Sequence, residues 1–427
     1  MAELTSAKGR EPQDEAATCA KTLLRAVACG PKRARSLTLI ESRSLLLGWS
    51  DSWVPDVSLG AALMVMRSRG ESCAEVAGMA LALRDLIDAG QPEPGLGGWV
   101  DGMPDFFDWP CYAGKRGQFP WLLYGVKRLE REGIPVLLHG DSETDVPSRR
   151  CHVGQMLAQV GIPKASSIAE ARYFLRERKS CYLPLGAILP QWPRLKALHQ
   201  QLGIRSLITQ ALKFINPLDA PMGMRAFFHP KLEGHYARVM GLIANETAVD
   251  CRQLLFRGFQ GETEPNPRVD TPLWCIEPLA QAASDLDPLQ PRWHLSACAP
   301  EGTQATLTAL GDDMLAHRRL AAAELPGAFD DSLQGASVRA SLAAAYLLGK
   351  RARTADEALR LAYGDGAEGE SLVKGSGAVA TLCRELMAAG AAEAEAVGLV
   401  RRYSMQTGKP MVQLAQELLR QRSAAAR

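Results

Sequence analysis

The sequence predicts an α/β domain that follows an all-helical N-terminal subdomain and precedes a small helical C-terminal segment. Apolar residues recur every three or four positions from Cys19 to about Ala89, as on one face of a helix. Beyond that point short apolar runs alternate with helical patterns, which indicates parallel strands joined by helices. A last helical pattern covers 378–422. The length of 427 residues is sufficient for two or three domains.

The first 90 residues divide into a tail and the helical subdomain. Residues 1–18 are polar and charged, and we expect them to be disordered. Helices are expected over 19–90, and the last of them, "ESCAEVAGMALALRDLIDAG", has acidic residues near its start and Gly90 at its C-cap. The segment that follows, "GQPEPGLGGWVDGMPD", is dense in glycine and proline and is expected to be a linker.

The α/β domain is expected over 100–365. Short buried strands are predicted at "IPVLLHG" (Ile134–Gly140), "MRAFFHP" (Met224–Pro230) and "CRQLLFRG" (Cys251–Gly258). Helical segments such as "CHVGQMLAQVG" and "YARVMGLIANE" lie between these strands. Two more helical segments lie within about 165–203, the first with Ser167 and Glu170 as a capping box, and we assign both to the helical subdomain.

The composition gives no global preference for a polyanion. The formal net charge is +2, so any attraction for nucleic acid must be local. Ten cysteines without a C-x-x-C pair indicate reduced thiols rather than a zinc site or a disulfide framework. The sequence contains neither a signal-peptide core nor an apolar run of membrane-spanning length, so we expect a cytoplasmic protein with no membrane partner.

Five local patterns, met in chain order, carry a resemblance to a known family. They are "GAALMVMRSRGESCAEVAGMALALRD", His139-Gly140, "RSLITQALKFINPL" (Arg205–Leu218), "RGFQGETE" (Arg257–Glu264) and "AAAYLLGKRARTADEALRLA". Over about Cys19 to Tyr363 the chain resembles the anthranilate phosphoribosyltransferase superfamily, glycosyltransferase family 3. The resemblance implies the nucleoside phosphorylase/phosphoribosyltransferase-like fold, in which a helical subdomain precedes an α/β domain with a diphosphate-binding loop.

Two functional motifs of that family are altered here. The family's "GTGGD" turn, whose N–H groups bind the diphosphate, is replaced by "PCYAG" (Pro110–Gly114), in which Pro110 has no N–H and Tyr112 fills space. The family's Asp-Glu pair, which holds magnesium, is replaced by Thr263-Glu264, so that one carboxylate is missing. We therefore do not expect the family's usual transfer reaction, and we assign no catalytic residue.

A second function stays open. An active glycosyl or phosphoribosyl transferase would use phosphoribosyl diphosphate or a related phosphate sugar, with Gly114–Gly117 as a shifted phosphate loop. Glu262 and Glu264 would then bind magnesium, whereas otherwise no cofactor is expected. Without such a role these two carboxylates would form a solvated turn.

A finer resemblance favours nucleic acid as the partner. "DWPxY", the basic loop that follows it, "PW" and "VLLHG" resemble the paralogue group that includes the YbiB protein. That group keeps the transferase fold but is associated with non-specific DNA and RNA binding by a homodimer. The resemblance implies single-stranded DNA or RNA as the partner, and a homodimer for which the apolar "GAALMVM" face of the N-terminal helices would serve.

The predicted nucleic-acid site consists of basic clusters and aromatic rings, because clustered cations attract phosphates and exposed rings stack on bases. The phosphate-binding set is Lys32, Arg33, Arg35, Lys115, Arg116, Arg149 and Arg150, with His139, Gly140 and Arg205 added from the family patterns. The stacking set is Trp109, Tyr112 and Trp121. Each set has a plainer alternative: basic pairs on a solvated face, a structural histidine, and tryptophans packed beside prolines.

The C-terminal segment carries a second resemblance. "EAEAVGLVRRYSMQTGKPMVQLAQELLRQ" (Glu393–Gln421) resembles the last two helices of ANTAR domains, which are RNA-binding antitermination modules. The helix before them is only partly reproduced, as "LCRELM" (Leu382–Met387).

Overall fold

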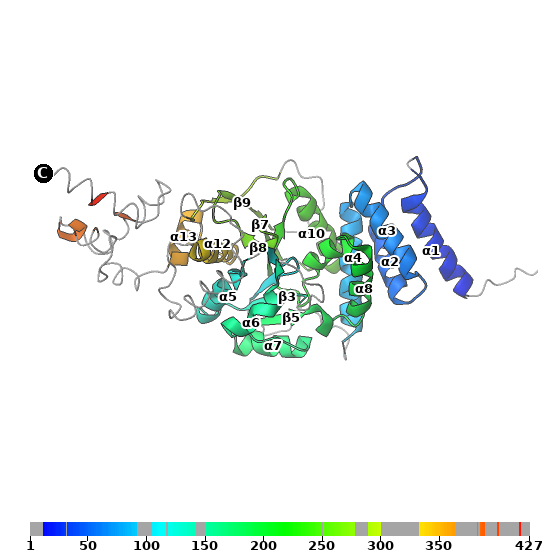
Figure 1. The fold of residues 1–427 in the computed structure, drawn as a ribbon, viewed down its shortest axis with the longest axis horizontal. Helices are drawn as coiled ribbons and strands as arrows, with labels where there is room; N and C mark the ends of the chain where they lie inside the picture. The colour runs from blue at the N-terminus through cyan, green and yellow to red at the C-terminus, as the bar shows by residue number, and fades with distance from the viewer. Residues whose placement is uncertain are drawn as a thin grey trace, which may run out of the picture.

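The structure is a computed structural model of the whole chain. It describes residues 12–30, 32–91, 105–116, 118–141, 150–249, 251–277, 289–299 and 333–363, together with short pieces at 382, 385–388, 399–400 and 418–419. Figure 1 shows a helical bundle at one end of the molecule and an α/β domain beside it. The two parts are joined by helices packed at the seam between them.

The bundle contains α1 (Pro12–Ala28), α2 (Leu39–Ser50), α3 (Asp56–Arg69) and α4 (Cys73–Ala89). Thr38 and Ser72 begin α2 and α4 with capping boxes, in which each hydroxyl accepts the N–H of a glutamate three residues later. The helices expected over 19–90 are therefore present. α1 begins earlier than the predicted end of the tail at residue 18, because a proline at the first helical position is followed by good helix formers.

The apolar face proposed for dimerisation lies largely inside the bundle. Ala62, Leu63 and Met66 of the "GAALMVM" stretch are at most 1% exposed. Ala61 of the same stretch is exposed and Met64 and Val65 are half-buried, so only this narrower strip could meet a second subunit. The large apolar side chains that α2 and α3 leave exposed include Ile40 (72%) and Val57 (82%).

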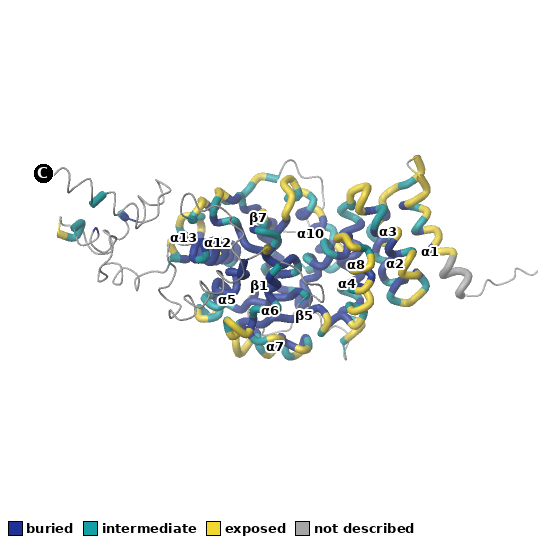
Figure 2. Tube along the Cα trace, viewed as in Figure 1, coloured by how far each residue is buried: buried dark blue, intermediate teal, exposed yellow. Residues whose placement is uncertain are grey.

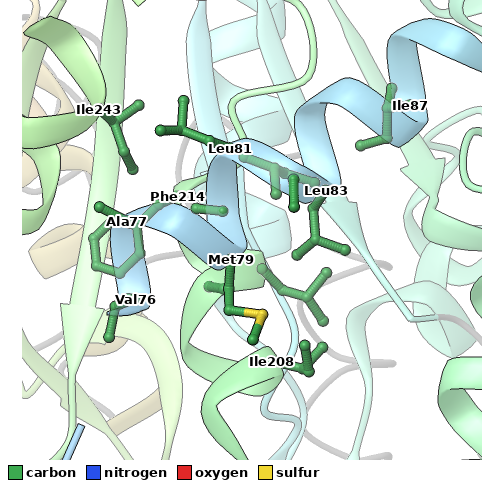
Figure 3. Close-up of a cluster of buried hydrophobic side chains, with 14 of the residues drawn as sticks. Val76, Ala77, Met79, Leu81, Leu83, Ile87, Ile208, Phe214 and Ile243 are labelled. Carbon is green, nitrogen blue, oxygen red and sulfur yellow. The ribbon is translucent and has the colours of Figure 1, made fainter. Parts of the chain in front are cut away.

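α4 attaches the bundle to the α/β domain. It packs against α9 (Leu207–Ala211) and α10 (Glu233–Thr247). Figure 3 shows side chains of α4, among them Met79, in one cluster with Ile208, Phe214 and Ile243. Because this cluster is continuous and apolar, the bundle and the α/β domain share one core.

The α/β domain is built on a mixed sheet with the strand order β10-β9-β7-β6-β1-β3-β5. Five neighbouring strands run parallel: β1 (Phe107–Pro110), β3 (Val136–Gly140), β5 (Ser180–Pro184), β6 (Met222–Phe227) and β7 (Arg252–Phe259). Antiparallel pairing adds β8 (Glu262–Pro265) and β9 (Thr271–Ile276) to β7, and β10 (Trp293–Leu295) to β9. The strands predicted at 134–140, 224–230 and 251–258 are confirmed as β3, β6 and β7.

Helices cover both faces of the sheet. Along β3 the side chains alternate, with Leu138 in the core beneath α5 (Leu122–Arg131), α6 (Val153–Val160) and α12 (Leu333–Leu348), and Leu137 in the core shared with the bundle. α13 (Ala355–Tyr363) packs on α12. Figure 2 shows the strands buried and the outer helices exposed along their solvent sides.

The helices within 165–203 divide between the two parts. α8 (Trp192–Leu202) packs against α3 of the bundle, whereas α7 (Ile168–Glu177) lies against β5 and β3. Both carry a similar amphipathic pattern, so the sequence did not distinguish their partners. No described helix is long and apolar enough to cross a membrane.

Candidate functional site

The loop after β1 uses its main-chain donors inside the protein. The N–H of Cys111 donates to the carbonyl oxygen of His139 at 2.7 Å, and the N–H of Gly114 donates to Glu262 Oε2 at 3.0 Å. Gly114 has φ +67°, and a Cβ there would lie 2.8 Å from His152 Nε2, so glycine is required for conformation and space. Neither of these two N–H groups is available to a diphosphate, and Pro110 has none.

Lys115 and Glu264 form a buried ion pair beneath this loop. Both side chains are fully buried, and Lys115 Nζ contacts Glu264 Oε2 directly. Glu264 Oε1 accepts the N–H of Leu122 at 3.1 Å. Lys115 is therefore not a surface phosphate ligand, which corrects the prediction, because its charge is matched inside the core.

Glu262 is also committed to the protein. Its carboxylate accepts the N–H groups of Gly114 and Thr263, both at 3.0 Å. The predicted magnesium ligands thus point at an ammonium group and main-chain donors, which do not fit a metal ion that needs free oxygen ligands. Among the described residues no cluster of three or more His, Cys, Asp or Glu side chains could hold a metal ion. The prediction of a solvated turn is wrong for this pair, because both carboxylates are buried, and their contacts do not support the predicted metal site.

Burial raises the pKa of Glu262 to about 7. Because the folded state holds this proton more tightly than the unfolded chain, its contribution to stability is complete below about pH 4.5 and is lost as the pH rises through 7. We expect the unfolding free energy of the wild type, relative to Glu262→Gln, to fall across this window by up to roughly 1.4 kcal/mol per pH unit. Urea denaturation of both proteins at several pH values measures this difference in unfolding free energy. A difference that stays constant with pH would contradict the prediction, and Glu246→Gln on the exposed side of α10 is the control.

A buried chain of polar groups fixes Tyr112. Its hydroxyl lies 2.8 Å from His139 Nδ1, His139 Nε2 lies 2.9 Å from Asp108 Oδ1, and Arg225 Nη2 lies 2.6 Å from Asp108 Oδ2. Burial opposes the ionisation of Asp108, but His139 and Arg225 outweigh it and hold its pKa below the ordinary value. Burial also raises the pKa of Tyr112, which keeps the phenol protonated.

His139 and Gly140 are packed inside the protein at the end of β3. His139 is fully buried, and a Cβ on Gly140 would lie 2.2 Å from the Cys111 carbonyl oxygen. Both residues are enclosed by protein atoms, which corrects their prediction as surface phosphate ligands. The ring of Tyr112, by contrast, lies at the wall of the cleft while its hydroxyl points inward.

The two tryptophans predicted to stack on bases belong to the core. Trp109 is 0% exposed, and its Nε1–H donates to the carbonyl oxygen of Thr263 at 2.9 Å. Trp121 is 1% exposed and packs with Phe119 and Tyr124. The alternative of tryptophans packed beside prolines is confirmed, because each ring fills space beneath α5 or beside β8.

Two adjoining cavities open at the seam between the bundle and the sheet. The first, which we name the apolar cavity, has a volume of ≈ 200 Å³ and is walled mainly by α8 and by residues 205–212, with Leu63 from α3. The second, the cationic cavity, has a volume of ≈ 320 Å³ and lies toward β2 (Lys115–Arg116) and α10. They share the residues Tyr112, Ala113, Arg150, Arg205, Ser206 and Thr209.

The cationic cavity is named for its lining. Its cationic side chains are Arg67, Arg116, Arg150, Arg205 and Lys213, and no acidic side chain is found among its described lining residues. Arg150 and Arg205 both donate to the carbonyl oxygen of Ala113, at 3.3 and 3.2 Å. Burial and the neighbouring charges of Arg205 and Arg116 lower the pKa of Arg150 to about 10, so the cluster repels itself and favours a bound anion.

The remaining predicted cations lie apart from the cavities. Arg35 pairs with Glu41 through two contacts of 2.6 Å, while Lys32 and Arg33 are exposed. Arg69 donates to the carbonyl oxygen of Arg35 at 2.7 Å, which ties this loop to the end of α3, where Arg67 lines the cationic cavity. Arg149 and nearly all of the C-terminal segment 378–422 lie outside the described residues.

Sequence reasoning missed Arg67 and Lys213, although it identified Arg116, Arg150 and Arg205. Arg67 occupies the last turn of α3, where a basic residue is common for reasons of helix stability alone. Lys213 lies in the short helix η2 (Leu212–Phe214), and its Nζ donates to the carbonyl oxygen of Ala226 at 2.9 Å. Nothing in the sequence separates these two from the other basic residues among 49.

Comparisons with known proteins agree with this architecture. The model of the glycosyl transferase family helical bundle domain matches residues 21–87. The uncharacterized protein YbiB of Escherichia coli is 26% identical over 250 residues, which cover 58% of this chain and 73% of that protein. An anthranilate phosphoribosyltransferase from a Synechococcus species is 25% identical over 221 residues, 50% of this chain and 60% of the enzyme, less than two thirds of its length.

Solved structures extend the similarity over most of the chain. Anthranilate phosphoribosyltransferase from Thermus thermophilus superposes with a TM-score of 0.57 at 16% identity, covering 81% of this chain and 93% of the enzyme. The Saccharomyces cerevisiae enzyme in complex with PRPP and Mg gives a TM-score of 0.56 at 15% identity, covering 82% and 93%.

The fold is therefore that of the anthranilate phosphoribosyltransferases: a helical bundle plus a mixed α/β sheet domain. In sequence the chain is similar to YbiB and to those enzymes at 24–26% identity, and the family model matches its helical bundle alone. The resemblance of the C-terminal segment to ANTAR domains receives no support from the comparisons.

Proposed function

We propose that this protein binds single-stranded DNA or RNA without sequence preference, through the cleft between the bundle and the sheet. The observation that carries the proposal is the cationic cavity, where five Lys and Arg side chains converge without an acidic lining residue among those described. Clustered cations release counterions from a nucleic-acid backbone, and arginine binds phosphate through a planar fork.

The cleft is longer than the binding of one phosphate group requires. A third cavity of ≈ 480 Å³ shares Phe228 with the cationic cavity and is lined by Lys231, Arg257 and Arg268 as well as by Glu233 and Asp270. Phe228 is 42% exposed and lies beneath the guanidinium of Arg116 at 5.9 Å. A run of basic side chains with an exposed ring supports an extended strand better than a single small phosphate.

Binding to a labelled single-stranded oligonucleotide, followed by fluorescence anisotropy at several salt concentrations, tests the proposal. If the five cations of the cationic cavity each neutralise one phosphate, the logarithm of the association constant falls with the logarithm of salt with a slope of about −3.5. Absence of binding at low salt, or binding that does not respond to salt, would contradict the proposal.

Transfer from phosphoribosyl diphosphate is the second candidate. The similarity to an enzyme solved with PRPP and Mg favours it at the level of the fold. The engaged N–H of Gly114 and the Lys115–Glu264 pair weigh against it, because they occupy donors and acceptors that a diphosphate and a metal need. Calorimetric titration with phosphoribosyl diphosphate and magnesium separates the two: saturating heat at micromolar ligand would favour the transferase.

A homodimer stays part of the proposal. Much of the "GAALMVM" face is buried within one chain, so the subunits would meet through its uncovered strip at Ala61, Met64 and Val65 together with exposed Ile40 and Val57. Two clefts on one particle would raise the avidity for a strand long enough to reach both.

A further inference from the structure

The apolar cavity is a second compartment of the same cleft. Six residues line both cavities, so an anion held by Arg150 and Arg205 sits at the mouth of the apolar cavity. The walls beyond that mouth are formed by Leu63 of α3, Trp192 and Leu195 of α8, and by Ile208 and Leu212. Asp141 and Lys196 also line this cavity and form an ion pair at 3.8 Å, so these two charges compensate each other and the apolar walls remain open to a neutral group.

Its size fits a planar ring. A cavity of about 150 Å³ is sufficient for benzene, and the apolar cavity has ≈ 200 Å³. The side chains of Trp192 and Tyr112 stand in its wall, and aromatic rings of this kind stack on bases irrespective of base identity. The buried bonds of Tyr112 hold its ring in place, so little side-chain freedom is lost when a ligand binds.

Neutral polar groups stand in the same wall. His152 and His199 both line the cavity. Burial and the charges of Arg150, Arg205 and Lys196 lower the pKa of His152 to about 4, and burial with the charge of Arg205 lowers that of His199. Both imidazoles are therefore neutral at pH 7, and a neutral imidazole carries one donor and one acceptor, as the edge of a base requires.

We infer that the apolar cavity receives one unpaired nucleobase of the bound strand while the adjacent phosphates lie on Arg150 and Arg205. The inference rests on the proposed nucleic-acid binding and adds a site for the base. It also gives a physical reason for a preference for single strands, since a duplex would first have to unstack and unpair that base.

Binding of matched strands to the wild-type protein tests the inference. An oligonucleotide of deoxyadenosine is compared with a strand of equal length whose sugars carry no bases, so that the phosphates are the same. We expect the base-bearing strand to bind at least about fivefold more tightly. Equal affinity would overturn the inference and leave the proposed function intact, whereas no binding of either strand would remove the proposed function itself.

A pair of variants on α9 locates the base. Thr209 lines both cavities, and Thr209→Phe is expected to close the mouth between them and bring the affinity ratio of the two strands close to one. Gln210 lines the cationic cavity and is absent from the described lining of the apolar one, so Gln210→Phe is the matched control and should keep the wild-type ratio. A wild-type ratio in Thr209→Phe, with unchanged binding of the base-free strand, would also overturn the inference.

Discussion

Reversing the charges of Arg116 and Arg205 is expected to weaken the binding of a single-stranded oligonucleotide about 100-fold or more. Both side chains are exposed and line the cationic cavity, one from β2 and the other from the turn that precedes α9. The Arg116→Glu/Arg205→Glu variant removes two charged hydrogen-bonding partners of the phosphates and adds two repulsive carboxylates. Fluorescence anisotropy at low salt, where the electrostatic contribution is largest, measures the loss.

The control variant carries the same change of net charge elsewhere. Arg131 at the end of α5 and Arg176 on α7 are exposed and lie outside the described linings of the three cavities. Arg131→Glu/Arg176→Glu should therefore retain most of the affinity, because it changes the net charge of the protein without removing a side chain from the cleft. Equal losses in the two double variants would mean that the oligonucleotide is held by the overall field and not by the cleft, which contradicts the proposed site.

Periodicity predicted most helices and the strands β3, β6 and β7, but it missed the strands β1, β5, β8 and β9. The capping residue Ser72 and the apolar runs at β3, β6 and β7 are local signals, and local signals identify helices and buried strands. β1 contains Asp108 and Pro110, which are both rare in central strands. The strand tolerates Asp108 because His139 and Arg225, from the neighbouring strands β3 and β6, compensate its charge.

The candidate site was predictable only where it depends on local composition. Arg116 and Arg150 follow from basic loops at the carboxyl ends of the parallel strands β1 and β3, whereas Arg205 came from a family pattern and Arg67 was missed. The fate of Lys115 does not follow, because its partner Glu264 lies 149 residues away. The burial of Trp109 could not be predicted either, because its indole N–H donates to a carbonyl group that lies 154 residues away in the sequence. A single sequence carries no signal for such distant pairs, so a buried lysine and an exposed one look alike.

The Lys115–Glu264 ion pair explains how the altered motif at Thr263-Glu264 is accommodated in the core without an unpaired charge. The two residues that replace the family's Asp-Glu pair, Thr263 and Glu264, are both bonded inside this chain: the Thr263 hydroxyl donates to the Pro110 carbonyl oxygen at 2.6 Å, and Glu264 pairs with Lys115. An internal ammonium thus neutralises the carboxylate that remains. The same contacts close β8 against the loop after β1 and leave the arginines on the open side of the cleft.

Removing one member of this pair is expected to cost about 3–5 kcal/mol of unfolding free energy. In Lys115→Met the carboxylate of Glu264 stays fully buried without its counter-charge, although it still accepts the N–H of Leu122. Methionine matches the length of the lysine stem, so the change removes charge more than volume. Urea denaturation measures the loss from the shift of the transition midpoint at constant slope.

A second variant separates the charge effect from simple disruption of the loop. In Lys115→Met/Glu264→Gln no uncompensated charge is buried, and the glutamine carbonyl can still accept the N–H of Leu122. We expect this double variant to regain most of the stability that the single variant loses, because replacing both partners of a buried pair costs far less than removing one. A double variant as unstable as the single one would show that the ammonium packs the loop rather than neutralising Glu264, and an undiminished stability in Lys115→Met would show that the pair is not buried in solution.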